Sequence, residues 1–169
     1  VLYNGTAKCW GFNAAGALGN ATTTSSSLPV AVSGLANAVR ISGGGFHSCA
    51  LLANGFVKCW GSNFSGQLGN GLGPIGSLVP VVVSALVSAV SIATGDNHSC
   101  ATLSNGTAKC WGENNFGQLG NATTVISSVP VVVSGLFGAR SISAGTSGSC
   151  ALLFNGTARC WGIDTVGQL

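Results

Sequence analysis

The chain repeats itself about every fifty residues, and almost every unusual residue falls on this period. The motif Cys-Trp-Gly begins at four positions, namely Cys9, Cys59, Cys110 and Cys160. A second cysteine keeps the same spacing at Cys49, Cys100 and Cys150, and so do Pro29, Pro80 and Pro130. A fixed period of this length indicates one supersecondary unit that recurs along the chain. We therefore expect function to reside in the array of units rather than in one pocket.

A β-hairpin stands out within the repeat formed by residues 42–92. Two short strand-like runs, His47–Leu52 and Phe56–Trp60, flank the tripeptide Ala53-Asn54-Gly55. An Asn-Gly between two such runs is the strongest short-range hairpin signal. The sequence therefore predicts two paired antiparallel strands in each repeat.

Two further strands complete the expected unit. Residues Ala38–Ser42 alternate weakly before the hairpin, and a glycine-punctuated loop, residues 61–69, follows it. Pro80 then opens Val81-Val82-Val83, a β-branched run that suggests a strand buried on both faces. Because no segment has helical periodicity, we predict an all-β array of four-stranded antiparallel sheets.

The boundaries of the repeats divide the chain unevenly. Residues 1–169 are expected to hold just over three tandem repeats: a partial blade at 1–41, repeats at 42–92 and 93–142, and a partial repeat at 143–169. Val1 aligns with Leu51 in mid-hairpin, and Leu169 aligns with Leu68 inside a loop motif. We therefore expect the chain to be a fragment of a longer one.

The residues of one repeat resemble a known family. The segment Phe46–Asn63, followed by Gly66-Gln67-Leu68-Gly69 and Pro80, resembles the repeat of the regulator of chromosome condensation family. The resemblance covers essentially the whole chain. Members of this family usually close seven such blades into a β-propeller, so the resemblance implies four-stranded blades in a propeller-like array. A closed ring and an open superhelix both remain possible.

The chain departs from the family pattern at three places. Ala17 stands where the other repeats have Gln, and Gly148 stands where they have His47 and His98. The paired cysteines are the third departure. Some relatives are intracellular exchange factors or chromatin proteins, but the low charge and the paired cysteines argue against that role here.

Hairpin geometry decides whether the two cysteines of a repeat can meet. If Gly55 supplies the left-handed residue of a three-residue loop, Leu52 faces Phe56. Counting outward sets Cys49 opposite Cys59 at a non-hydrogen-bonded position, where Cα atoms lie about 4.5 Å apart, within disulfide range. The predicted disulfides are Cys49–Cys59, Cys100–Cys110 and Cys150–Cys160. The alternative is that small buried thiols merely fill space between strands.

Cys9 is the odd cysteine, because its facing position would precede residue 1. We attribute its lack of a partner to truncation rather than to a functional thiol. No Cys-x-x-Cys or Cys/His cluster has metal-ligand spacing, so no metal or other cofactor is expected. Disulfides on this scale imply an oxidising compartment, which favours a secreted or cell-surface protein.

Charged residues make up only 5% of the chain, and the net charge is +3. A typical soluble domain has roughly 25% charged residues, so solubility must come from Ser, Thr and Asn, from glycan, or from packing against copies. The few cations spread along the chain suggest no basic patch and no nucleic-acid partner. The longest apolar stretch, residues 79–93, is interrupted and too short to span a membrane.

Seven of the thirteen asparagines lie in Asn-x-Ser/Thr sequons. Five are expected at hairpin tips or in exposed loops and are predicted N-glycosylation sites: Asn4, Asn20, Asn105, Asn121 and Asn155. Asn63 and Asn97 are poorer candidates, because they lie in the Trp-Gly-x-Asn loop and at a strand start. The alternative is a Ser/Thr-rich bacterial sequence that carries no glycan.

No arrangement of residues predicts catalysis. His47 and His98 have Gly148 as their third counterpart and no paired carboxylate, so we expect a structural or surface role. The three acids occupy unrelated repeat positions: Asp96, Glu113 and Asp164. Cations do recur before each Cys-Trp-Gly cysteine, at Lys8, Lys58, Lys109 and Arg159. Stem packing or a cation–π contact explains this row, and an interaction stripe is the alternative.

The sequence is most consistent with a non-catalytic structural or adhesive repeat module of a secreted glycoprotein, such as a component of an extracellular filament. Its partners would be copies of itself or other extracellular proteins, together with N-linked glycans. The alternative is a propeller module that binds a protein or carbohydrate ligand. The third is an intracellular exchange-factor-like propeller.

Overall fold

The computed structural model describes residues 1–169 and is built entirely from β-strands and their connections. The thirteen strands, in chain order, are β1 (Lys8–Gly11), β2 (Ser26–Ala31), β3 (Ala38–Gly43), β4 (His47–Leu52), β5 (Val57–Gly61), β6 (Ser77–Val82), β7 (Ala89–Thr94), β8 (His98–Leu103), β9 (Ala108–Gly112), β10 (Ser127–Val132), β11 (Ala139–Ala144), β12 (Gly148–Leu153) and β13 (Ala158–Gly162). It holds no helix long and apolar enough to cross a membrane.

The strands form antiparallel sheets that follow one another along the chain. Two sheets have four strands, in the orders β3-β4-β5-β6 and β7-β8-β9-β10. A two-stranded sheet, β1-β2, precedes them, and a three-stranded sheet, β11-β12-β13, follows. The prediction of an all-β array of four-stranded antiparallel sheets is confirmed. The sheets themselves begin at Ala38, Ala89 and Ala139.

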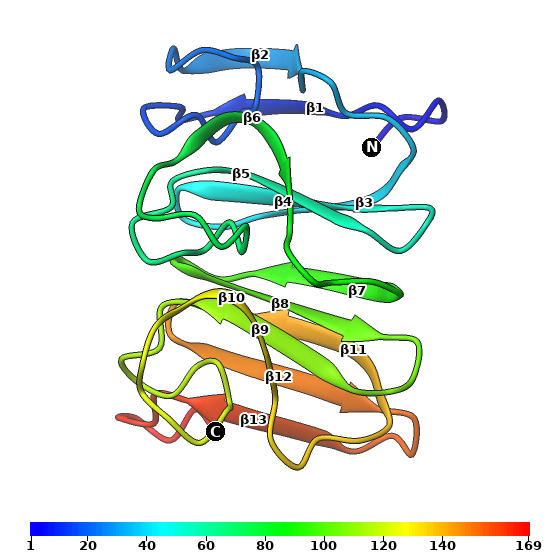
Figure 1. Ribbon diagram of the computed structural model, residues 1–169, viewed down its shortest axis with the longest axis vertical. Helices are drawn as coiled ribbons and strands as arrows, with labels where there is room; N and C mark the ends of the chain where they lie inside the picture. The colour runs from blue at the N-terminus through cyan, green and yellow to red at the C-terminus, as the bar shows by residue number, and fades with distance from the viewer.

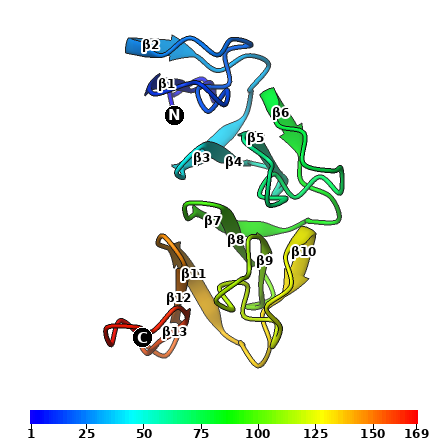
Figure 2. The same ribbon diagram turned by 90° about the vertical axis from the view of Figure 1, so that its left-hand side faces the viewer.

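The sheets are arranged as the blades of an open arc (Figure 1). Figure 2 shows the first strand of each sheet, β3, β7 or β11, toward the concave side of the arc, and β6 and β10 toward the outside. Strand β7 contacts both β3 and β11, so neighbouring blades meet along their inner strands. No sheet in the structure closes on itself.

The proline-valine segment lies at the outer edge of its blade. Pro80 is in β6, which pairs with β5 on one side only, and Val82 is 51% exposed. The prediction of a strand buried on both faces is therefore wrong. Proline has no N–H to donate, so it suits the unpaired side of an edge strand and discourages pairing with another chain. The valines pack on one side, where Val83 is buried.

The hairpin register is the one that a three-residue loop requires. The Leu52 amide donates to the Phe56 carbonyl at 2.9 Å, and Gly55 has φ of +79°. Each hairpin tip also holds the start of the next blade, because the Ala89 amide donates to the Gly55 carbonyl at 3.0 Å. A Cβ on Gly55 would lie 3.0 Å from the Ser88 Cα, so glycine permits this close approach.

A buried tryptophan joins each blade to the one before it. Trp111 of β9 packs in a cluster with Leu68, Val83 and the Cys49–Cys59 pair of the preceding blade. Removing a tryptophan side chain from water contributes roughly 4–6 kcal/mol at about 25 cal/mol per Å². The core therefore lies mostly between the sheets, and each blade needs its neighbour.

The two ends of the strands give the arc two distinct faces. The hairpin face holds the tips centred on Asn4, Asn54, Asn105 and Asn155, with the turns that lead into β3, β7 and β11. The loop face holds residues 12–25, 62–76, 113–126 and 163–169, with the turns at 44–46, 95–97 and 145–147. In Figure 1 the hairpin face lies on the right and the loop face on the left.

Candidate functional site

Each complete hairpin holds one disulfide across its two strands. Cys49 lies opposite Cys59 in the register, with the Cα atoms 4.0 Å apart. The same arrangement recurs at Cys100–Cys110 and Cys150–Cys160, also with Cα separations of 4.0 Å. Of these six residues, the four in the two complete blades are fully buried. The disulfides are therefore part of the core between the blades rather than exposed redox groups.

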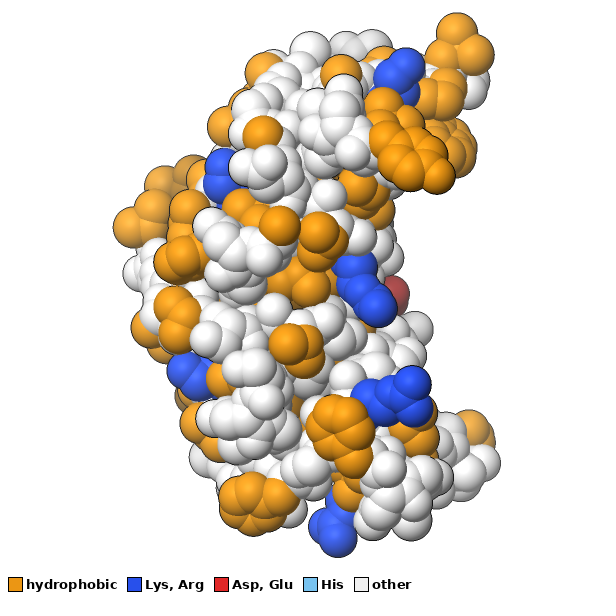
Figure 3. All heavy atoms as spheres, turned by 90° about the vertical axis from the view of Figure 1, so that its right-hand side faces the viewer, with side chains coloured by type: hydrophobic (Ala, Val, Ile, Leu, Met, Phe, Trp, Pro, Cys, Tyr) orange, Lys and Arg blue, Asp and Glu red, His pale blue; other side chains and the backbone are white.

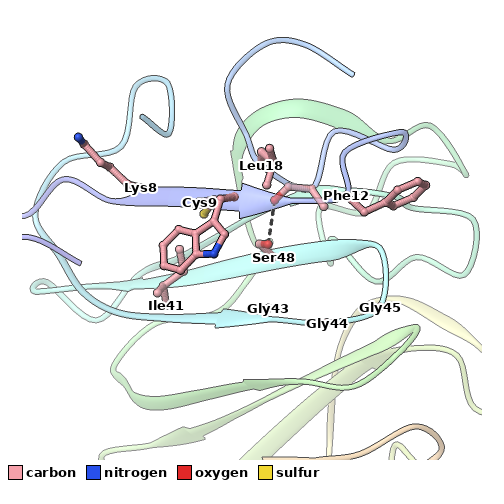
Figure 4. A pocket seen from close by; sticks show the side chains of 11 residues that line it. Lys8, Cys9, Phe12, Leu18, Ile41, Gly43, Gly44, Gly45 and Ser48 are labelled. Carbon is pink, nitrogen blue, oxygen red and sulfur yellow. Dashed lines mark hydrogen bonds between the residues drawn. The ribbon is translucent and has the colours of Figure 1, made fainter. Parts of the chain in front are cut away.

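Cys9 is a free, half-buried thiol beside a pocket of about 530 Å³. Figure 4 shows Cys9 on β1 near Ile41 of β3 and Ser48 of β4, with the Lys8 side chain pointing away. Burial raises the pKa of Cys9, and the positive chain terminus opposes that shift. A protonated thiol is a poor nucleophile, so this pocket has no activated cysteine.

The five favoured sequons share one local geometry. In each, the asparagine Oδ1 accepts hydrogen bonds from the amide and hydroxyl of the threonine two residues later, as Thr107 does with Asn105 at 3.1 and 2.7 Å. The same pair of bonds forms at Asn4, Asn20, Asn121 and Asn155. N-glycans attach to Nδ2, which makes no hydrogen bond within the protein at any of these five sites.

Asn63 and Asn97 have a different arrangement. The Asn63 side chain is buried, and its Nδ2 donates to the Gly73 carbonyl at 2.9 Å. The half-buried Asn97 donates from Nδ2 to the Glu113 carboxylate at 3.3 Å. Both amides are therefore engaged within the loop face, and both are structural in this fold.

A buried polar relay connects successive blades. His47 Nε2 lies 2.8 Å from Ser99 Oγ, and that hydroxyl donates to the Gln67 carbonyl at 3.0 Å. The Trp111 indole donates to the same carbonyl at 2.9 Å. Because the single proton of Ser99 goes to Gln67, we assign the proton of His47 to Nε2. The relay therefore holds the blades together through a neutral imidazole.

The next pair of blades repeats this relay. His98 Nε2 lies 2.9 Å from Ser149 Oγ, which donates to the Gln118 carbonyl at 3.0 Å. Both histidines are fully buried, and Nδ1 of each has no hydrogen-bond partner. The sequence predicted a structural or surface role for these histidines, but their partners lie about fifty residues away, so only the fold reveals the contact.

Burial lowers the pKa of both histidines to about 4. At His47 the charge of His98 lowers the pKa further, and the Asp96 backbone opposes this shift. Both imidazoles are consequently neutral at physiological pH and remain poor candidates for proton transfer near pH 7.

The charged side chains divide by sign between the two faces. Every lysine and arginine lies within the first three residues of a strand that starts at the hairpin face: Lys8, Arg40, Lys58, Lys109, Arg140 and Arg159. The three acids follow strands or occupy turns on the loop face: Asp96, Glu113 and Asp164. Figure 3 shows the cations across the hairpin face. The fold therefore places on one face cations that lie far apart in sequence, and they stand apart from one another among neutral side chains.

A shallow groove of about 410 Å³ lies on the loop face. Its lining includes Phe64, Leu72 and Pro74 from the loop after β5, and Ile126 from the loop before β10. Phe64 is 83% exposed. The groove is apolar and contains no charged residue in its lining, so it suits binding rather than acid–base chemistry.

Comparisons with known proteins agree with this architecture. Two sequence models described as Regulator of chromosome condensation (RCC1) repeat match the chain, one at residues 38–67, 89–118 and 139–168 and the other at 4–51, 54–102 and 105–152. Among curated proteins, no match was found.

Several solved structures share the fold. Human WBSCR16 matches 99% of this chain with a TM-score of 0.86 and 22% identity. Yeast RCC1 (Prp20), in its complex with Kap60, matches 92% with a TM-score of 0.77 and 23% identity. This chain spans 45% and 39% of the length of those two chains. Since the family repeat matches more than half of its residues, the chain belongs to the RCC1 repeat family.

Proposed function

We propose that this chain is a non-catalytic structural or adhesive module of a secreted or cell-surface glycoprotein. The carrying observation is the disulfide at the same cross-strand position in every complete hairpin. Such bonds persist in oxidising compartments and are rare in the cytosol. Each one staples a hairpin whose neighbours complete its core, which favours a rigid body over a mobile active site.

The five open sequons support the same role. Their Nδ2 atoms are free of hydrogen bonds within the protein, and the tip residues Asn4, Asn105 and Asn155 are exposed. In a chain with 5% charged residues, N-glycans at these sites would supply the missing hydrophilic surface. The blade β3–β6 would carry no glycan at the equivalent positions. Asn54 and Asn70 form no sequon there, because they precede Gly-Phe and Gly-Leu.

The test uses protein isolated from its native source. Peptide mapping without reductant should find the three disulfides, and glycosidase treatment should lower the mass of peptides that contain the five open asparagines. Peptides with Asn63 and Asn97 serve as internal controls and should keep their mass. Free thiols at all seven cysteines in material protected from reductant would refute an extracellular location.

Assembly of copies is the second part of the proposal. The many exposed apolar side chains and the low charge favour side-chain contacts with further copies or other extracellular proteins. Sedimentation of native material at micromolar concentration should show particles larger than one chain. A monodisperse monomer with both termini sealed inside a seven-bladed ring would remove the filament from consideration.

A ligand-binding module is the second candidate, and the apolar groove around Phe64 favours it. A structure of Prp20p from Saccharomyces cerevisiae was described with its binding properties to Gsp1p and histones, so a relative of this fold binds proteins. Phe64→Ser should weaken capture of a protein or carbohydrate ligand without changing sedimentation. If Phe64→Ser instead disperses the assembly, the groove is a contact between copies.

A further inference from the structure

The hairpin face carries all six cations of the chain and none of its acids. Four of them begin the third strand of their blade at Lys8, Lys58, Lys109 and Arg159, one per blade. Arg40 and Arg140 lie near the start of the inner strands β3 and β11. Four cations therefore follow an arc at the spacing of the blades, and the inner strands add two more, on β3 and β11 but not on β7.

These cations are directed to solvent rather than to buried partners. Lys8, Arg40, Arg140 and Arg159 are exposed, and Lys58 is half-buried. Lys109 alone makes a hydrogen bond within the protein, from Nζ to the Ala85 carbonyl at 3.2 Å. With the three acids on the opposite face, the charges on this face add rather than cancel.

Aromatic rings stand beside the cations on the same face. Tyr3, Phe56 and Phe154 flank the hairpin tips, and Phe137 occupies the turn into β11. Phe137 and Phe154 are 75% and 73% exposed, although large apolar side chains are ordinarily packed. Exposed aromatic rings on the face that holds the cations suit a partner that has both anionic groups and flat apolar faces.

We propose that the hairpin face binds a linear anionic polysaccharide, a polymer of sugar rings that carry carboxylate or sulfate groups. The cations that recur along the arc would bind the repeated anions, and the aromatic rings would contact the C–H faces of the sugars. This inference rests on the proposed extracellular role, since the disulfides place the chain where such polymers occur rather than with nucleic acids. The blade β3–β6 supplies Arg40, Lys58 and Phe56 beside a tip that has no sequon.

The experiment measures binding of oxidised protein to immobilised heparin and polygalacturonate, with neutral dextran as a control, over a range of salt concentrations. The test variant combines Arg40→Gln, Lys58→Gln and Arg140→Gln, three side chains without hydrogen bonds in the fold. We expect a loss of affinity of about tenfold or more, and a slope of log affinity against log salt that falls by about two. Matching thermal unfolding curves verify that the variant is folded.

A matched variant neutralises the opposite face through Asp96→Asn, Glu113→Gln and Asp164→Asn. Its affinity should stay within about twofold of the parent, because screening limits the reach of charges on the far face. If the cation variant lost affinity and the acid variant gained the same amount, the proposal would be overturned in favour of an effect of net charge alone. Tighter binding to double-stranded DNA than to either polysaccharide at equal salt would assign the face to nucleic acid.

Native glycosylated protein provides the last arm of the test. Enzymatic removal of N-glycans should leave binding intact or strengthen it, since the tip sugars lie on the same face. Because the assay uses purified oxidised protein, it does not depend on location. Free cysteines in native material would refute the extracellular role alone, whereas equal affinity of the parent and the cation variant would refute the polysaccharide site alone.

Discussion

Acid should unfold this protein through its two buried histidines. His47 and His98 are neutral in the folded state because burial lowers each pKa to about 4. In the unfolded chain the imidazole pKa is about 6.5. Above pH 6.5 neither state binds these protons, so the contribution of the neutral relay is fully present. As pH falls from 6.5 toward 4, the unfolded state takes up protons first, and stability is lost.

The size of the loss follows from the two pKa values. One pKa unit corresponds to about 1.4 kcal/mol. Between pH 6.5 and pH 4.5, a range of about two pH units, the unfolded state binds a proton at each histidine that the folded state largely does not. The two sites together should lower the free energy of unfolding by about 5 kcal/mol between pH 7 and pH 4.5. Most domains have a free energy of unfolding of only about 5–15 kcal/mol, so this loss is large.

Urea titration at a series of pH values, with the disulfides intact, measures this quantity. The control is His47→Gln with His98→Gln, which keeps an N–H to donate to Ser99 and Ser149 but cannot titrate. The variant should be less stable than the parent at pH 7 and should lose far less stability at pH 4.5. Equal losses of stability in the parent and the variant would refute the reasoning and show that other groups cause the acid sensitivity.

Three further changes test the packing between blades. Gly69→Ala should lower the free energy of unfolding by about 2–4 kcal/mol, because φ at Gly69 is +65° and a Cβ would lie 2.6 Å from Trp111 Nε1. Gly73→Ala is the control and should leave the urea unfolding curve unchanged, because a Cβ there would have nothing within 4 Å. Replacing both Cys100 and Cys110 by Ala should cost about 3 kcal/mol in the same assay, and a loss below 1 kcal/mol would contradict a structural role. Asn114→Ala should cost about 2–4 kcal/mol because its buried amide orders the loop after β9, whereas exposed Asn115→Ala should leave the melting temperature unchanged.

Local rules were enough to predict the hairpins. The tripeptide Ala53-Asn54-Gly55 fixes the loop length, and the loop length fixes which residues face each other across the strands. That count places Cys49 against Cys59, as the register of the structure does. Register depends on a few neighbouring residues, so a single sequence contains it.

The outer strand was misjudged because a β-branched run has two interpretations. Val81-Val82-Val83 is equally compatible with a central strand and with an edge strand that packs on one side. The decisive residue is Pro80, which cannot donate to a ladder and therefore belongs at an edge. Pro80, rather than the valines, therefore indicates that β6 is the edge strand of its sheet.

Contacts between repeats were beyond reach of the sequence. His47 forms a hydrogen bond with Ser99, which lies 52 residues further along the chain, and no sequence feature near either residue indicates this contact. The segregation of charge was hidden for a related reason, since cations fifty residues apart look dispersed along the chain. A usable signal did exist, because Lys58 and Lys109 each follow an Asn-Gly tip by the same number of residues.

The relay also explains why the first repeat tolerates alanine where the others have glutamine. Trp60 and Ser48 both donate to the Ala17 carbonyl at 2.9 Å, as Trp111 and Ser99 donate to that of Gln67. The acceptor that joins the blades is thus a main-chain oxygen, which any residue supplies. The glutamine side chain makes further bonds: Gln67 Oε1 accepts from the Ser65 amide of its own loop at 2.9 Å, and Nε2 donates to Asn97 Oδ1 of the next blade at 3.4 Å. A substitution at this position therefore removes the side-chain bonds to the loop and to Asn97 but keeps the main-chain acceptor that joins the blades.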